Sequence, residues 1–312
     1  MATIDLTTPA PTPEGILEGL PRRVALTLPE LRVLAARAGD APLPFELVEP
    51  EAGGNAFESR LGQSRLARDD EAYVDALATL NDPADSLTKR GLIAEGVADS
   101  GIIGALGLLA TPSVAVDIDV TLAGARARAW HRQRDDAVAT LATTDGLVFE
   151  LAWFGRSHWA DELARVAVLP EDITPGTSNA PDVVDLPYEL LDAGAEAIRS
   201  GRTELLGTII AHHTGDTRDA SGQPVDDATV SSLISALSTE TQGRLRAMVA
   251  SINGADEADS QLVGVVSWVL LADGWRVLHP HQEGAEHRVE VRRVEATDLA
   301  MALAPVLAEV TA

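Results

Sequence analysis

Two long stretches of this chain carry similar sequence patterns in the same order, and this repetition limits the folds that the chain can adopt. Residues 24–39, VALTLPELRVLAARAG, resemble residues 183–201, VVDLPYELLDAGAEAIRSG. Each has Leu-Pro, then Glu-Leu, then apolar residues at helical spacing and a final Gly. The next predicted helix follows after 45 residues in the first stretch (Leu28 to Tyr73) and after 44 in the second (Leu186 to Val230). We therefore predict that one α+β unit has been duplicated.

Each stretch leads into a run of predicted strands, where the apolar period changes from 3.6 to 2. In SVAVDIDVTL, residues 113–122, apolar residues alternate with polar ones, so Asp117 and Asp119 share the polar face. ARARAWHR, AVATLATT and LVFELAWF follow as further strands, and Asp145-Gly146 is a hairpin signal between the last two. GRLRAMVASI, QLVGVVSWVLLADG, WRVLHP and HRVEVRRV match these four strands in the second half.

The predicted fold class is α+β. We expect two tandem repeats related by a quasi-twofold axis, each with helices, a four-stranded antiparallel sheet and a closing helix. The closing helices are predicted in SHWADELARVAVL and TDLAMALAPVLAEV. Between Ala84 and Pro112 the pattern is typical of helix, turn and helix, with Ser100 as the cap of the second helix.

The predicted domain organisation follows from the same repetition. Residues 1–23, which are polar and carry prolines, are expected to form a disordered leader, and residues 24–169 the first repeat. Residues 170–182 hold three prolines and few apolar residues, so they are interpreted as a linker before the second repeat, residues 183–312. A mobile loop is predicted at residues 51–70.

The charge balance argues against two classes of partner. The chain has 24 Lys plus Arg and 48 Asp plus Glu, so its formal net charge is −24, which repels nucleic acid and anionic membrane surfaces. It has no cysteine, which excludes disulfides and thiolate chemistry, and no apolar run of transmembrane length. We predict a cytoplasmic protein that inserts in no membrane and is a monomer or a weak homodimer.

Asp117 and Asp119 form a D-x-D pattern that could hold a divalent ion, as carboxylate oxygens do in sugar-nucleotide transferases. The alternative needs less, because an alternating strand must be polar on one face. Arg126 and Arg128 alternate on the next predicted strand, so we expect them to pair with the aspartates across the sheet. The solvated-face interpretation is favoured, and a metal-dependent transferase or hydrolase stays the alternative.

The histidines give a second set of candidate metal ligands. His212 and His213 stand near Asp216, whereas His279 and His281 form a His-Pro-His sequence that is interpreted as a turn. Neighbouring histidines on a helix point about 100° apart and rarely chelate one ion, and no H-E-x-x-H pattern occurs. We therefore expect structural histidines, and we assign no catalytic residue, no cofactor and no metal site. The chain is predicted not to be an enzyme.

Three stretches resemble one family. LPELRVLAARAGDAPLPF resembles the opening of the EspG family, the cytosolic chaperones of actinobacterial type VII (ESX) secretion. LTKRGLIAEGVADSGIIGALGLLATPSVAVDIDV resembles that family's middle, with a Leu-x-x-Arg-Gly-Leu turn, a helix, an Ala-x-Pro break and an acidic strand. GVVSWVLLADGWRVLHP, followed by HRVEVRRVEATDLAMAL, resembles its C-terminal end. The resemblance spans most of residues 24–310.

The resemblance implies a non-catalytic, quasi-twofold α+β protein that needs no cofactor. Members of the family bind the apolar helical tip of PPE proteins in PE–PPE heterodimers, keep these substrates soluble and direct them to their secretion machine. An apolar tip aggregates unless it is covered, and an acidic carrier can cover it. The family's contact surface includes the loop between the second and third strands and helices of the C-terminal half. By position, the partner-binding residues implied here are Gln133, Arg134, Asp135, Asp136, Val230, Leu233, Ile234 and Leu237.

Overall fold

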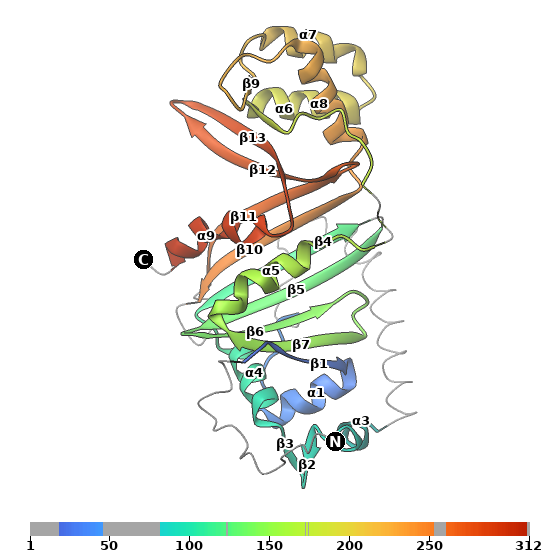
Figure 1. The fold of residues 1–312 in the computed structure, drawn as a ribbon, viewed down its shortest axis with the longest axis vertical. Coiled ribbons are helices and arrows are strands. Elements are labelled where there is room, and N and C mark those ends of the chain that lie inside the picture. The colour runs from blue at the N-terminus through green and yellow to red at the C-terminus, as the bar shows by residue number, and fades with distance from the viewer. Residues whose placement is uncertain are drawn as a thin grey trace, which may run out of the picture. The chain divides into compact units, whose positions relative to one another are not determined.

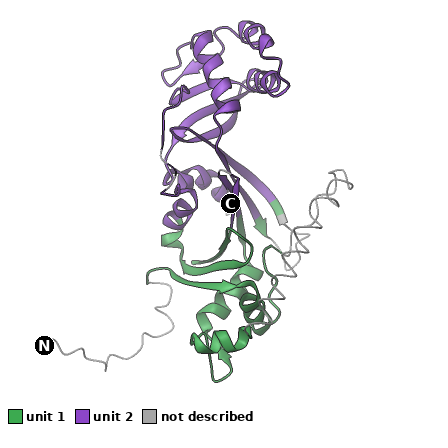
Figure 2. Cartoon of the chain, turned by 90° about the vertical axis from the view of Figure 1, so that its right-hand side faces the viewer, with its two compact units in different colours: residues 1–116, 129–159, 251–261 green, residues 117–128, 160–250, 262–312 purple. Residues whose placement is uncertain are grey.

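A computed structural model describes residues 19–45, 82–122, 124–171, 173, 175–252 and 260–310. The chain divides into two compact units, coloured separately in Figure 2. Unit 1 comprises residues 1–116, 129–159 and 251–261, and unit 2 comprises residues 117–128, 160–250 and 262–312. None of the described helices is both long and apolar enough to cross a bilayer. The predicted leader up to residue 18, the loop at 51–70 and the helix at 71–80 lie outside the described residues.

The two halves of the chain present their elements in one order (Figure 1). Within the described residues, each half has a strand, two helices, a short β segment, a third helix, four long strands and a closing helix. The first half contains β1 (Arg22–Thr27), α1 (Leu28–Arg37), α3 (Pro83–Lys89), β2 (Ile93–Ala94), β3 (Val97–Ala98), α4 (Ser100–Ala110), β4 (Val114–Leu122), β5 (Ala125–Arg134), β6 (Ala137–Thr143), β7 (Val148–Gly155) and α5 (Trp159–Ala167).

The second half contains β8 (Val183–Pro187), α6 (Tyr188–Arg199), α7 (Leu206–His212), β9 (Arg218–Asp219), α8 (Asp227–Thr239), β10 (Gly243–Ile252), β11 (Ser260–Leu271), β12 (Gly274–Glu283), β13 (Glu286–Val294) and α9 (Asp298–Val310). Short 3₁₀ turns precede α5, at Arg156–His158, and α7, at Thr203–Leu205.

Eleven of the strands in the described part of the chain form one sheet, in the order β1-β7-β6-β5-β4-β10-β11-β12-β13-β8-β9. The first five strands, β1-β7-β6-β5-β4, have their counterparts in β8-β13-β12-β11-β10, with β9 added at the end. The α+β class with a large antiparallel sheet is confirmed. Within the described residues, the first half contributes five strands to this sheet and the second half six, where four each were predicted, because β1, β8 and β9 are added. Descent of both halves from one duplicated unit stays a prediction.

Local sequence explains where several elements begin. Thr27 and Glu30 form a capping box at the start of α1, in which the Thr27 N–H donates to Glu30 Oε2 (2.9 Å). The cap of α4 is Asp99, whose carboxylate accepts from the N–H groups of Gly101 (2.8 Å) and Ile102 (3.1 Å), so the expectation that Ser100 is the cap is wrong by one residue. The predicted Asp145-Gly146 hairpin joins β6 to β7, where Gly146 has φ +73°.

The repeated Leu-Pro sequence takes two conformations. Leu28 and Pro29 open the first turn of α1, whereas Leu186 and Pro187 end β8, where they pair with β13. One extra residue, Tyr188, stands before the Glu-Leu of the second copy, and α6 begins there. The sequence likeness of the two segments therefore extends further than their local structural likeness.

Each unit has its own apolar core. In unit 1, α1 and α4 pack on β6 and β7 through fully buried residues such as Leu31, Leu106 and Leu151. In unit 2, α6, α7 and α8 pack on β8, β11 and β13 through Leu190, Leu233 and other buried side chains. On the opposite face of β11, Val306 of α9 lies so close to Gly264 that a Cβ there would be 2.7 Å from it.

The predicted linker is attached to unit 2 over its last residues. The Gly176 N–H donates to the carbonyl of Ala272 (2.6 Å), and the Arg293 N–H donates to the carbonyl of Asp182 (2.7 Å). The Ser178 hydroxyl donates to Glu240 (2.8 Å), and Ala180 is buried in the unit 2 core. Residues 176–182 of the predicted linker are therefore held against unit 2 by hydrogen bonds and by the burial of Ala180.

Candidate partner-binding surface

The Asp117–Asp119 pattern of β4 lies beside arginines of β5. Asp119 accepts hydrogen bonds from Arg126 Nε (2.8 and 3.0 Å) and from Arg126 NH2, and Arg128 Nε lies 3.9 Å from Asp119 Oδ2. The cross-strand charge pairing predicted for Asp119 is confirmed. Within the described ranges, no three His, Asp or Glu side chains come together as a metal site would require.

Two of the candidate histidines, His213 and His281, each lie beside a carboxylate. His213 Nδ1 lies 3.4 Å from Asp216 Oδ2, and the ring of His212 meets that of His213 edge-on. His279 and His281 lie within β12, so the predicted turn at His-Pro-His is wrong. A proline fits there because, in the described part of the sheet, the register of β12 with β11 ends at Leu278, before Pro280.

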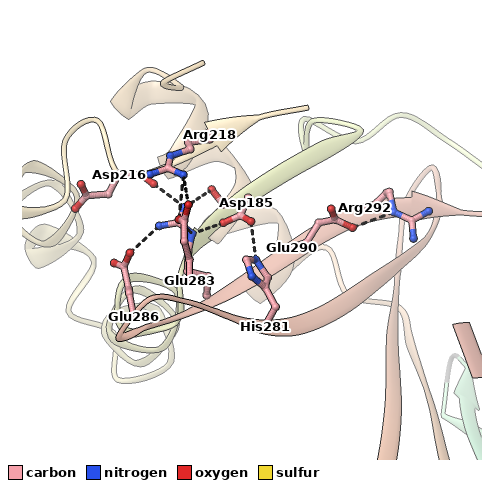
Figure 3. A network of polar contacts seen from close by, with 9 residues as sticks. Asp185, Asp216, Arg218, His281, Glu283, Glu286, Glu290 and Arg292 are labelled. Atoms are coloured by element: carbon pink, nitrogen blue, oxygen red, sulfur yellow. Dashed lines mark hydrogen bonds and ion pairs between the residues drawn. The ribbon is translucent and has the colours of Figure 1, made fainter. Parts of the chain in front are cut away.

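Arg288 of β13 is the centre of a polar network in unit 2, and Figure 3 shows its partners Asp185, Asp216 and Glu286. Its side chain is 1% exposed, and its Nε donates to Asp185 Oδ1 (2.6 Å) while NH1 donates to Glu286 (3.0 Å). NH2 donates to the carbonyl of Asp216 (2.8 Å). Arg288 thereby joins β8 and β13 to the loop that leads toward α8.

The surroundings of the network fix its charge state. Burial by itself lowers the pKa of Arg288, but the hydrogen bonds to Asp185 and Glu286 outweigh it and raise the pKa above the ordinary value. His281 Nε2 lies 2.7 Å from the second oxygen of Asp185, and Arg218 donates to Glu283 (3.0 Å). The sequence analysis missed Arg288, because nothing in HRVEVRRV distinguishes this arginine from the exposed Arg292.

The first predicted contact region, Gln133–Asp136, lies in unit 1. Gln133 and Arg134 belong to β5, and only Asp135 and Asp136 form the turn, so the predicted loop is half strand. Gln133 is 6% exposed and its amide donates to the Asp135 carbonyl, while Asp135 has φ +52°. This is a tight hairpin in which Arg134, Asp135 and Asp136 are exposed.

The second predicted region, on α8, lies in unit 2. Val230, Leu233 and Ile234 are at most 3% exposed, and Leu237 is partly buried against the same core. The apolar stripe chosen from the sequence therefore faces the chain's own interior, as an amphipathic helix requires. The accessible side of α8 carries small polar and apolar residues: Ala228, Ser231, Ser232 and Ser235.

The first contact region was placed at the loop between the second and third strands, and the additional strand β1 changes which loop that is. With β1 as the first strand of the large sheet, the second and third strands in chain order are β4 and β5. Their connection lies between Leu122 and Ala125. The start of β10, which follows α8, touches this end of β4: a Cβ on Gly243 would lie 2.5 Å from Leu122 Cδ2. The β4–β5 connection and the C-terminal end of α8 thus lie near each other within unit 2.

Comparison with known proteins identifies the architecture. No protein-family model matches the sequence, and no curated protein matches it significantly. The structure superimposes on the Mycobacterium tuberculosis type VII secretion system chaperone EspG5, solved in complex with the PE25–PPE41 dimer, with a TM-score of 0.60. The match covers 92% of this chain and 96% of that chain at 13% identity. This chain has the EspG fold.

The structural match to EspG5 and the sequence resemblance to the EspG family cover similar parts of the chain. Both extend over most of the chain, and the described residues contain the large antiparallel sheet that the resemblance implies. At 13% identity the likeness concerns the arrangement of the backbone, so each side chain of the EspG-like sheet must be judged from its own contacts.

Proposed function

We propose that this protein is a cytoplasmic, non-catalytic chaperone of type VII secretion, which binds the helical tip of a PE–PPE-like heterodimer. The observation that carries the proposal is the likeness to EspG5 over nearly the full length of both chains. The protein keeps its substrate soluble by covering an apolar tip that would otherwise aggregate. It needs no cofactor, and the strongly acidic surface keeps the free carrier soluble.

We place the contact surface in unit 2, at the β4–β5 connection and the accessible side of α8. Small side chains such as Ser231, Ser232 and Ser235 allow the backbone of a partner helix to approach α8 closely. The Arg288 network stabilises the loop that precedes α8, because Arg288 donates a hydrogen bond to the carbonyl of Asp216. In unit 1, the exposed Arg134, Asp135 and Asp136 remain candidates for an additional contact.

The alternative is a metal-dependent transferase or hydrolase that uses Asp117 and Asp119 or the histidines. The contact between Arg126 and Asp119 speaks against it, because a guanidinium at that carboxylate opposes a second cation. Asp119→Asn and metal analysis of the purified chain test it. A bound divalent ion that disappears in the variant would support the enzyme.

The proposal is tested by affinity capture of the tagged full-length chain from its native cytoplasm, followed by mass spectrometry. We expect a pair of small helical proteins in amounts comparable to the chain, encoded near a secretion ATPase. Ser232→Arg, on the accessible side of α8, should abolish their recovery, whereas Ala160→Arg, an exposed position of α5, should not. Recovery of no such pair, or equal recovery with both variants, would overturn the proposed function or its surface.

A further inference from the structure

The face of the sheet that carries Asp119 has a charge opposite to that of the whole chain. In β10 the residues alternate between buried and exposed, and the exposed ones at its start are Arg244 and Arg246. In β5 the exposed Arg126 and Arg128 flank Asp119. The contact of Gly243 with Leu122 aligns the buried residues of β10 with those of β4, so the exposed residues of both strands share the other face.

Four arginines therefore face two aspartates, Asp117 and Asp119, in a chain with twice as many acidic as basic residues. All six residues belong to unit 2. Asp119 is already paired, because it accepts hydrogen bonds from Arg126. For Arg244 and Arg246, the described part of the chain provides no ion pair, and both side chains are exposed. Most other exposed arginines of unit 2 have a carboxylate partner, as Arg199 has in Glu196 and Arg218 in Glu283.

We infer that this arginine face, defined by Arg126, Arg128, Arg244 and Arg246, binds an extended acidic polypeptide segment. Two residues along a strand span about 6.8 Å, so the guanidinium groups of Arg244 and Arg246 repeat at the spacing of alternate carboxylates on an extended peptide. Guanidinium groups bind carboxylates through paired hydrogen bonds. The face thus matches a segment with acidic residues at every second position.

The negative charge of the rest of the chain makes an acidic peptide a better ligand for this face than a nucleic acid. A nucleic acid carries a phosphate at every nucleotide and extends beyond the face, where a net charge of −24 repels it. A short peptide with a lower charge density stays within the face, and repulsion beyond a Debye length of about 8 Å is screened. The arginine face begins beside the β4–β5 connection, but the inference does not depend on the proposed chaperone function.

The test measures the fluorescence anisotropy of a fluorescein-labelled peptide of alternating glutamate and threonine, titrated with the full-length chain at low salt. We expect saturable binding that disappears at high salt. We also expect affinity about tenfold weaker for Arg244→Gln/Arg246→Gln. The matched control is Arg199→Gln/Arg202→Gln, which removes the same charge from exposed positions of unit 2 outside the face and should bind as the unchanged chain does.

Three results would overturn the inference. One is binding of the peptide that is equal in the Arg244/Arg246 variant and the control variant. Another is absence of saturable binding by the unchanged chain. The third is stronger binding of a labelled oligothymidylate, or of anionic lipid vesicles, than of the peptide. Equal circular dichroism spectra of the two variants show that lost binding is not lost folding.

Discussion

Each half of the molecule joins a strand to its helical segment through a buried charge, and the two charges have opposite signs. In the first half the buried charge is the carboxylate of Glu30, which accepts from Arg90 NH1 (2.9 Å), Ser86 (2.8 Å) and the Thr27 N–H. In the second half it is the guanidinium of Arg288, held by Asp185 and Glu286. Both networks join the strand that precedes the first helix of the half, β1 or β8, to the helical segment of that half.

This difference shows which features the EspG fold requires. Both halves have the same order of elements and apolar faces on their strands and helices, while their buried polar networks differ. Burying apolar area supplies most of the stability, and a polar network need only satisfy its own members. We therefore expect equivalent core substitutions to act alike in the two halves and substitutions in the polar networks to act differently.

The largest losses of stability are expected when the leucine that follows the glutamate of each repeated Glu-Leu sequence is replaced. Leu31 of α1 and Leu190 of α6 are both fully buried. Leu31→Ala and Leu190→Ala should each lower the free energy of unfolding by about 3 kcal/mol, because each leaves a cavity in a closed core. Urea denaturation measures both. A difference of more than about 2 kcal/mol between them would show that the halves are not equivalent in packing.

The next effect concerns the buried guanidinium. Arg288→Met should lower the free energy of unfolding by about 2–3 kcal/mol, since Asp185 and the Asp216 carbonyl lose their donor. Hydrogen exchange read by mass spectrometry should place the loss of protection in β8, β13 and residues 212–219. Arg292→Met, at an exposed position of the same strand, is the control and should change little. Loss of protection confined to the first half would contradict this account.

The third prediction concerns the pH dependence of the free energy of unfolding, which is expected to depend on a buried histidine of the first half. His131 of β5 is buried, and burial together with the nearby Arg132 lowers its pKa to about 3, while Trp159 Nε1 donates to its Nδ1 (3.1 Å). The unfolded chain binds a proton near the ordinary pKa of 6.5 and the folded chain does not, so stability falls as pH drops below that value. We expect a loss of about 2 kcal/mol between pH 7 and pH 5.

His131→Gln, which cannot gain this proton, should lack the corresponding part of the pH dependence. Urea denaturation at a series of pH values measures the difference. If the variant and the unchanged chain have parallel stability profiles, His131 is not the group responsible.

The smallest effect is expected at Glu30. Glu30→Gln keeps the shape of the side chain but loses the charge that Arg90 faces, and Arg90 is itself partly exposed, so the expected loss is about 1 kcal/mol. Although burial raises the pKa of Glu30, hydrogen bonds from Thr27, Ser86 and Arg90 lower it below the ordinary value. The stabilising effect of this carboxylate is therefore present above pH 4.5 and is lost as pH falls through its lowered pKa. Urea denaturation that shows a loss as large as that of Arg288→Met would remove the contrast between the networks.

The sequence predicted the features that depend on local periodicity. The strict alternation of Val114 to Val120 identified β4, Asp145-Gly146 identified a hairpin, and the pairing of Asp119 with arginines followed from the polar face. It could not predict features set by distant segments. Arg288 is buried only because β8 and the Asp216 loop cover it, and the histidines of β12 continue a strand because β13 pairs with them.

The candidate site shows the same limit. Val230, Leu233 and Ile234 were chosen because they are apolar, yet the periodicity that makes α8 a helix also directs them into the core. An apolar residue on an amphipathic helix is therefore weak evidence for a contact residue. The short strand β1 carries too few residues for a clear alternation, so the strand count shifted with it.

The central proposal is that this chain, which has an EspG-like fold, binds a helical PE–PPE-like dimer on unit 2. The most direct measurement is the binding of the purified heterodimer, obtained by affinity capture, to the full-length chain by isothermal titration calorimetry. We predict one heterodimer per chain, with affinity reduced at least about tenfold by Ser232→Arg and unchanged by Ala160→Arg. Binding that is indifferent to Ser232→Arg, or no heat of binding for the unchanged chain, would contradict the account.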